Sequence, residues 1–181
     1  MKYIVLFLGV GILFSCKTEK KDAESMPLPP KREITQQESI SISRFWTSDE
    51  AYKIKRFVER REWNAVQTES GLYYYIFDAN PKAKQAKPGD EVLIKYEIRL
   101  LDADTTLCYA SAPNQTETVL IEMDNIEAGL HEGLAKLREG EKAFIILPHY
   151  LAHGLVGDLD KIPPLSPVLY KIELVKIKEN E

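Results

Sequence analysis

The sequence predicts an α+β domain in which antiparallel strands surround one helix, and two patterns support this class. Segments in the C-terminal half alternate apolar and polar residues with the period of a half-buried strand, most clearly residues 91–101. Between two such segments, Ile126, Leu130, Leu134 and Leu137 recur instead at helical spacing. Several strands with a single helix among them are typical of an α+β fold.

The individual elements follow from composition and from turn residues. Residues 72–77 are a dense aromatic and β-branched run, and the polar loop after them ends in the turn Pro88-Gly89-Asp90. The remaining strands are expected at 118–123, 142–147 and 168–177, and the helix is expected to end at Arg138-Glu139-Gly140. A phase slip near Leu174 predicts a bulge in the last strand.

The first fifteen residues are predicted to be an export signal. An apolar run at 3–14 follows Lys2, and as a helix it would rise only about 18 Å, too short for a hydrocarbon core of about 30 Å. Ser15-Cys16 resembles the bacterial lipobox, which implies a lipid-modified Cys16 as the first mature residue. The alternative is a plain secretory signal with an incidental cysteine. We expect a membrane-anchored protein, because two or three acyl chains hold a chain firmly.

A tether and a helical extension are expected before the domain. Residues 16–34 are charged and rich in proline with almost nothing to bury, so they predict a disordered tether. Within the extension at 35–70, Thr47 and Glu50 have capping-box spacing, and apolar residues after them predict an amphipathic helix over 48–62. This helix could pack on the domain or on a second copy. The domain is favoured, because one helix is short for a dimer seam.

Composition excludes some function classes. The chain has 181 residues, enough for one domain plus an extension, and its formal charge of −4 argues against a nucleic-acid partner. With Cys16 acylated, Cys108 has no partner for an intramolecular disulfide and is expected to be a small buried hydrophobe. His149 and His153 have a spacing that invites a metal, but Pro148 and Gly154 disfavour the helix that it needs. Neither a metal nor a cofactor is expected.

A series of motifs resembles the FKBP family of peptidyl-prolyl isomerases over residues 71–179. In order they are Ser70-Gly71-Leu72-Tyr73-Tyr74, Pro88-Gly89-Asp90, Gly129-Leu130-His131-Glu132-Gly133-Leu134, Glu139-Gly140-Glu141, Leu147-Pro148, Leu151-Ala152-His153-Gly154 and Ile162-Pro163-Pro164. The resemblance implies that 71–181 is an isomerase domain with a curved antiparallel sheet wrapped around one helix. Together with the lipobox, the chain is most similar to gliding-motility-associated FKBP-like lipoproteins.

The resemblance also implies a cup that holds a proline ring. Its expected catalytic members are Tyr96, Tyr109, His153 and Tyr170, and its expected substrate-binding members are Cys108, Ile126, Leu130 and Ile162. The Ile126 amide would be the donor that faces the ligand. Cys108 and Tyr109 stand where the family has phenylalanine and aspartate, Leu130 where it has tryptophan, and His153 where it has tyrosine. From its strand pattern alone, Tyr96 could equally be an ordinary core residue.

Such a cup would act without a nucleophile. Rotation about an X-Pro bond is slow because the amide loses resonance, and an apolar pocket that removes water favours the twisted amide. One function is therefore an isomerase that acts on proline-containing exported polypeptides at the cell envelope, in the setting of a gliding-motility apparatus. The other is a chaperone or binding module that keeps the fold with little turnover. The substitutions at Cys108 and Tyr109 favour the second, and the retained wall residues favour the first.

Overall fold

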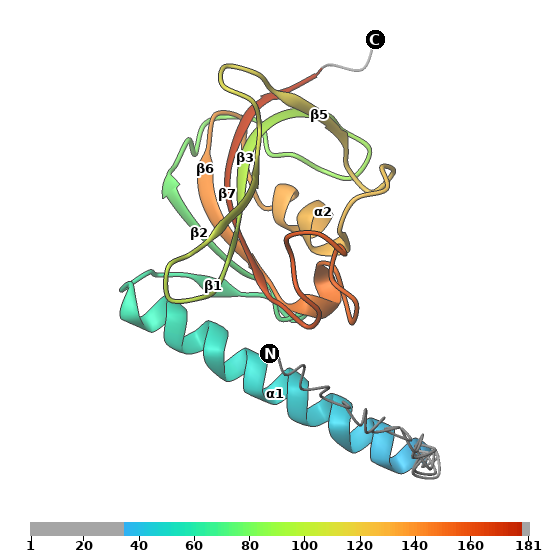
Figure 1. Cartoon of the computed structure of the whole chain (residues 1–181). Helices are drawn as coiled ribbons and strands as arrows, with labels where there is room; N and C mark the ends of the chain where they lie inside the picture. The colour runs from blue at the N-terminus through green and yellow to red at the C-terminus, as the bar shows by residue number, and fades with distance from the viewer. Residues whose placement is uncertain (1–34, 179–181) are drawn as a thin grey trace, which may run out of the picture. The chain divides into compact units, whose positions relative to one another are not determined.

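The structure is a computed structural model that describes residues 35–178. The predicted signal peptide, Cys16 and the tether at 16–34 lie outside these residues. The elements, labelled in Figure 1, are α1 Gln36–Arg60, β1 Val66–Gln67, β2 Tyr73–Asp78, β3 Glu91–Leu100, β4 Leu107–Ala110, β5 Glu117–Leu120, α2 Ala128–Leu134, β6 Lys142–Leu147, a 3₁₀ turn η1 His149–Leu151, and β7 Val168–Ile177. Within 35–178, no helix has the length and apolar composition needed to span a membrane.

All seven strands form one antiparallel sheet, which confirms the predicted α+β class. The strand order is β1-β2-β6-β7-β3-β4, and β5 pairs with β3 beside β4. Figure 1 shows the strands curving around α2. The predicted bulge is present, because Leu93 pairs with Lys176 while Ile94 pairs with Leu174, which leaves Val175 as the extra residue.

The inner face of the sheet and α2 form the main core. Leu130 and Leu134 of α2 are buried against the inward-pointing side chains of β3, β6 and β7. The helix comes close because Gly133 has no side chain: a Cβ there would lie 2.8 Å from Ile145 Cδ1. Alternation along the strands thus provides one apolar face that covers the helix.

Helix α1 begins twelve residues before the predicted start. Glu38 N–H donates to Thr35 Oγ1 at 3.2 Å and Thr35 N–H donates to Glu38 Oε2 at 3.0 Å, so the capping box is formed here. The predicted range 48–62 was wrong at its start, because the same spacing recurs inside the helix. There Thr47 Oγ1 donates to the Ser43 carbonyl, one turn back, at 2.9 Å.

The C-terminal half of α1 packs on the outer face of the sheet, as favoured from the sequence. Ile54, Phe57 and Val58 form a second buried cluster with outer-face residues of β2, β6 and β7, namely Tyr73, Ile146 and Leu169. Just after the helix, Trp63 stacks on Phe144 with ring centroids 4.4 Å apart. The N-terminal half is different: the side chains of Phe45 and Trp46 are 65% and 44% exposed.

A buried ion pair fixes α1 to the chain just after β6. Glu50 is 6% exposed and accepts hydrogen bonds from His149, from its backbone N–H at 2.8 Å and from its ring Nδ1 at 2.7 Å. A buried carboxylate needs such partners because desolvation otherwise disfavours its charge. One helix residue therefore orders the segment that leads into the loop at 152–166.

Two predicted elements have different bounds in the structure, and two observed strands were not predicted. The strand expected at 118–123 ends at Leu120, because the Leu120 N–H donates to Asp124 Oδ2 at 2.7 Å in a turn. The helix expected at 126–137 spans only Ala128–Leu134, and Leu137 lies in the turn that follows. Strands β1 and β4 were not predicted. They are two and four residues long, too short to show a period of their own.

Candidate functional site

The eight predicted cup residues come from six different parts of the chain and lie together on the inner face of the sheet. Seven of them belong to or pack against one hydrophobic cluster: Tyr96, Cys108, Tyr109, Ile126, Leu130, Ile162 and Tyr170. The eighth, His153, joins them through a shared contact with Glu127. Tyr96 and Tyr170 have ring centroids 6.2 Å apart, so they share one face of the sheet.

The cup residues form a buried floor and a partly exposed rim. Cys108, Leu130, Ile162 and Tyr170 are 5%, 4%, 2% and 1% exposed and make up the floor. Tyr96, Tyr109, Ile126 and His153 are half-buried and make up the rim. An incoming polypeptide would therefore meet the rim residues first.

Glu127 also belongs to this site, although its residue type did not reveal it. It is the N-cap of α2, with φ −62° and ψ 135°, but its side chain makes no capping hydrogen bond. The Tyr170 hydroxyl instead donates to Glu127 Oε1 at 2.9 Å. Burial, and then the Glu127 carboxylate, raise the pKa of Tyr170 well above its usual value, so this hydroxyl keeps its proton.

His153 lies against the same carboxylate oxygen. Its Nε2 is 2.9 Å from Glu127 Oε1, with both side chains mostly buried. This is a close contact without the alignment of a hydrogen bond, and Nε2 has no hydrogen-bond partner among the described residues. Both Tyr170 and His153 thus converge on Glu127, the start of α2.

A second polar group ties the rim to the loop at 152–166. The Tyr109 hydroxyl donates to Asp158 Oδ2 at 2.5 Å and approaches Asp160 Oδ2 at 3.2 Å. Asp158 also accepts from the backbone N–H groups of Asp160 and Ile162, at 2.9 and 2.8 Å. Desolvation raises the pKa of Asp158, but these hydrogen bonds outweigh it and lower the pKa to about 2. The same hydrogen bond raises the pKa of Tyr109, because the hydroxyl must keep its proton to donate it to Asp158.

Cys108 is a floor residue of the cup and not a reactive thiol. Burial, followed by the charge of Asp158, raises the pKa of the Cys108 thiol. Its backbone carbonyl accepts a hydrogen bond at 3.0 Å from Lys161 Nζ, which also lies 4.6 Å from the centroid of the Tyr109 ring. The structure therefore agrees with a small buried hydrophobe at this position.

The two histidines with the spacing that invites a metal, His149 and His153, have separate partners. His149 is paired with Glu50 of α1 at 2.7 Å, and His153 is paired with Glu127 at the start of α2. His153 thus belongs to the rim of the cup, while His149 is part of the junction between α1 and the domain.

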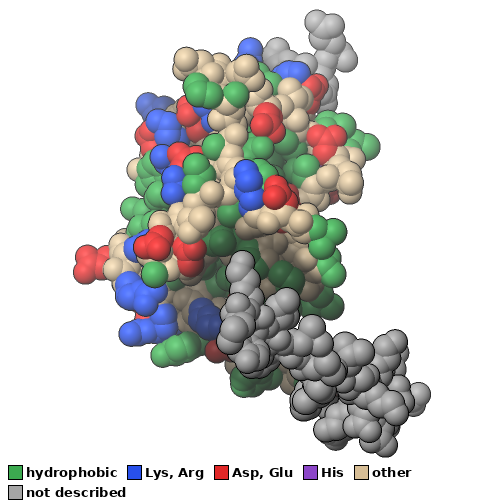
Figure 2. Space-filling model, in the orientation of Figure 1, with side chains coloured by type: hydrophobic (Ala, Val, Ile, Leu, Met, Phe, Trp, Pro, Cys, Tyr) green, Lys and Arg blue, Asp and Glu red, His purple; other side chains and the backbone are tan. Residues whose placement is uncertain are grey.

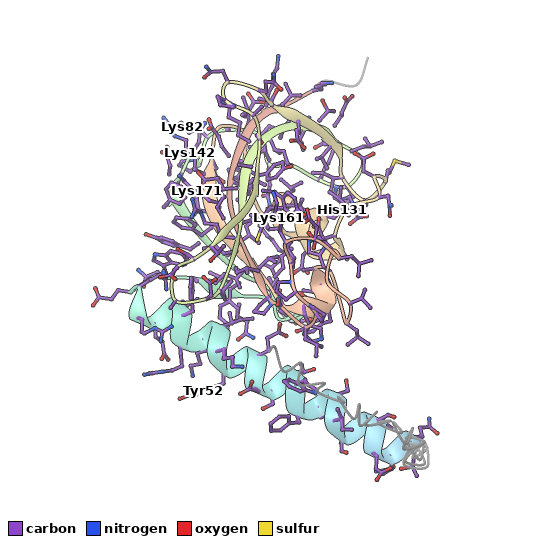
Figure 3. The ribbon with its side chains drawn as sticks, in the orientation of Figure 1. Tyr52, Lys82, His131, Lys142, Lys161 and Lys171 are labelled. Carbon is purple, nitrogen blue, oxygen red and sulfur yellow. The ribbon has the colours of Figure 1, made fainter. Side chains whose placement is uncertain are left out.

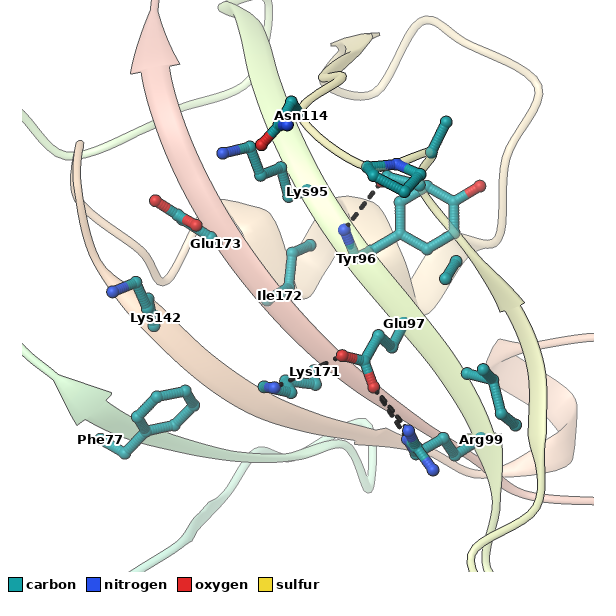
Figure 4. A pocket seen from close by; sticks show the side chains of 15 residues that line it. Phe77, Lys95, Tyr96, Glu97, Arg99, Asn114, Lys142, Lys171, Ile172 and Glu173 are labelled. Carbon is teal, nitrogen blue, oxygen red and sulfur yellow. Dashed lines mark hydrogen bonds and ion pairs between the residues drawn. The ribbon is translucent and has the colours of Figure 1, made fainter.

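A groove of about 640 Å³ is lined by charged outer-face residues of the sheet, and its lining also includes the rim residue Tyr96 (Figure 4). Its charged lining alternates in sign: Glu97 pairs with Arg99 at 2.8 Å and with Lys171 at 3.4 Å. Figure 3 labels Lys142 and Lys171 close together at the left of the sheet and Lys161 nearer the middle of the view. In Figure 2, acidic and basic side chains are interspersed over the visible face.

Comparisons with known proteins agree with this geometry. The family model for FKBP-type peptidyl-prolyl cis-trans isomerases matches residues 82–175, a range that contains all eight cup residues. The isomerase FkpA of Escherichia coli is 27% identical over 133 residues, which cover 72% of this chain and 47% of that protein. A probable FkpA of Neisseria meningitidis is 33% identical over 114 residues, or 63% of this chain and 40% of that protein.

A solved structure supports the fold directly. The crystal structure of FkpA from Escherichia coli has a TM-score of 0.58 and 25% identity, and the match covers 78% of this chain and 67% of that one. The chain spans about half the length of the curated relatives that it matches. Because the family model matches residues 82–175, more than half of the 181 residues, this chain belongs to the family of FKBP-type peptidyl-prolyl cis-trans isomerases.

Proposed function

We propose that the chain catalyses cis-trans isomerisation of X-Pro bonds at the cup residues. The observation that carries the proposal is their convergence: side chains from three strands, two loops and α2 meet on one face of the sheet, all within the family match. Isomerisation by desolvation needs walls on several sides of one proline ring, and residues on opposite faces of the sheet would not supply them.

The proposed mechanism has no covalent step. The aromatic rings of Tyr96 and Tyr170 and the aliphatic side chains of Leu130 and Ile162 would hold the proline ring away from water. Removal of water favours the twisted amide, which is less polar than the planar one. The Ile126 amide would hold the displaced carbonyl oxygen. A lowering of the barrier by about 7 kcal/mol would accelerate rotation about a hundred-thousand-fold.

Exchange NMR on a short prolyl peptide, with the full chain added, tests this function. We expect acceleration of cis-trans exchange by the wild-type protein and a loss of at least about tenfold in kcat/KM for Tyr96→Ala. Phe77→Ala is the matched control, because Phe77 is a half-exposed aromatic residue that lines the groove on the outer face. Its kcat/KM should match that of the wild type. No acceleration by the wild-type protein would refute the proposal.

The alternative of a binding module with little turnover has one structural feature in its favour. The four floor residues are at most 5% exposed, so a proline ring must displace side chains to reach them. Tight binding of a prolyl peptide with no accelerated exchange would favour this alternative over the isomerase.

We also propose that the protein works at a bacterial cell envelope, anchored by a lipid on Cys16, on exported clients of a gliding-motility apparatus. The support is the sequence alone: the short apolar run, the lipobox-like Ser15-Cys16 and the polar stretch after it. Metabolic labelling with a palmitate analogue tests the anchor, since Cys16→Ser cannot form the thioether. Label that persists on the variant would contradict it.

A further inference from the structure

The site carries a buried acidic group in a place where a proline-binding cup needs only apolar walls. Glu127 Oε1 touches one floor residue and one rim residue, Tyr170 and His153, each at 2.9 Å. Its side chain is only 15% exposed. A carboxylate in such surroundings is costly to desolvate, and the Tyr170 hydroxyl and the His153 ring offset part of that cost.

The orientation of Glu127 follows from its place in the chain. As the N-cap of α2 it has the extended backbone usual for that position, but its side chain makes no hydrogen bond to the free N–H groups of the helix. The more usual role of a polar N-cap side chain is to accept from those N–H groups. Because Glu127 does not, its charge is directed at the cup residues rather than used to start the helix.

Other carboxylates strengthen the negative field around the rim. Burial raises the pKa of the rim residue Tyr96, and the charges of Glu117 and then Glu127 raise it further. Asp158 and Asp160 face the Tyr109 hydroxyl from the opposite loop. The lysine on this side, Lys161, is committed to the Cys108 carbonyl and the Tyr109 ring, and His153 lies against Glu127.

We propose that Glu127 makes the site select prolyl bonds preceded by a basic residue, Lys or Arg, and reject those preceded by Asp or Glu. This inference rests on the proposed function of the cup. When a proline ring is held among the cup residues, the side chain of the residue before it can lie about 7 Å from the Glu127 carboxylate, because two extended residues span about 7 Å. Because the surrounding walls are apolar, that charge is poorly screened.

The expected size of the effect is a ratio. At a separation of about 7 Å, the full screening of bulk water would still leave a change in binding of about tenfold when a positive neighbour is exchanged for a negative one, and weaker screening would make the change larger. We therefore expect kcat/KM for a Lys-Pro peptide to exceed that for the matched Glu-Pro peptide by about tenfold, with Gln-Pro between them. Added salt should reduce this ratio.

The variant that tests the assignment is Glu127→Gln, in which the amide oxygen can still accept from the Tyr170 hydroxyl. We expect the Lys-to-Glu ratio to fall to about twofold or less in this variant. Glu173→Gln is the matched control, because Glu173 is a half-buried carboxylate that lines the outer groove. It should keep the wild-type ratio.

The outcomes separate this inference from the proposed function. An equal ratio in Glu127→Gln and wild type would overturn the assignment and move the selectivity to another acidic group. A wild-type protein that accelerates exchange without charge preference would refute the inference and leave the isomerase intact. If the protein binds peptides without turnover, the Lys-to-Glu ratio of dissociation constants from NMR titration decides instead. Failure to bind either peptide would refute both.

Discussion

The junction between α1 and the domain gives a prediction whose size follows from the structure. Glu50→Ala removes the acceptor for two donors of His149, the backbone N–H and the ring Nδ1, at 2.8 and 2.7 Å. The side chains of His149 and Glu50 are only 9% and 7% exposed, so water cannot easily replace the lost partner. Two buried donors are then left without an acceptor.

The expected loss of stability is about 3 kcal/mol. Each buried donor without a partner costs about 1–3 kcal/mol, and breaking a buried ion pair from one side costs about 3–5 kcal/mol in total. For a chain of this length, about 3 kcal/mol lowers the midpoint of thermal unfolding by about 6–12 °C. Glu50→Gln keeps one acceptor oxygen, and we expect about half of this loss.

Thermal unfolding followed by circular dichroism measures the loss, and hydrogen exchange locates it. Faster exchange at Ile54, Phe57 and Val58 without faster exchange in β3 would show that α1 separates locally. Asp49→Ala is the matched control, since Asp49 is one residue away and forms an exposed pair with Lys53 at 2.7 Å. Equal destabilisation by Glu50→Ala and Asp49→Ala would refute the reasoning.

Substitutions at three further positions test other parts of the molecule. Asp158 has a pKa of about 2 against about 3.9 unfolded, so its contribution is complete above about pH 4 and is lost as pH falls towards 2. The difference in unfolding free energy between wild type and Asp158→Asn should therefore shrink over this range, and a constant difference would contradict the assignment. Gly129→Ala should destabilise by about 1–3 kcal/mol in urea unfolding, because its Cβ would lie 2.7 Å from Leu147 Cδ2 and 2.9 Å from the Leu151 carbonyl oxygen. If Gly129→Ala instead stabilises the protein by about 1 kcal/mol, as the helix propensity of alanine over glycine alone would give, then α2 can move to make room for the new Cβ, and the reasoning is contradicted. Tyr170→Phe should cost about 1 kcal/mol and Tyr170→Ala about 3–5 kcal/mol with weaker prolyl-peptide binding, and equal losses would contradict a packing role.

Much of the fold could be predicted because its strands are covered on one face and partly exposed on the other. Strands β6 and β7 were predicted with their observed bounds, and β3 within one residue, since burial on one face imposes a period of two. The start of α1 could not be chosen by spacing alone, because a threonine three residues before a glutamate occurs both at Thr35 and at Thr47. Burial of Glu50 against His149, a residue 99 positions away, decided between them.

The site was predicted only in part. The cup residues could be found through their motifs, which fix both residue type and order. Glu127 could not, because an acidic residue before a helix normally indicates a cap, and only the tertiary position of Tyr170 and His153 shows that its carboxylate is directed elsewhere. The partner of Tyr109 was also hidden, since Asp158 lies 49 positions away in a loop without periodicity.

The two tryptophans lie in contrasting surroundings, so their intrinsic fluorescence reports on two different parts of the structure. Trp63 is stacked between Phe144 and Tyr75 at the foot of α1, whereas Trp46 is 44% exposed on the N-terminal half of the same helix. Emission from Trp63 will shift to the red when α1 leaves the sheet, while quenching of Trp46 by iodide will respond to anything that covers that half of the helix. Variants that keep only one of the two tryptophans would thus distinguish release of α1 from the sheet from binding of a partner to α1. Neither measurement needs an attached dye.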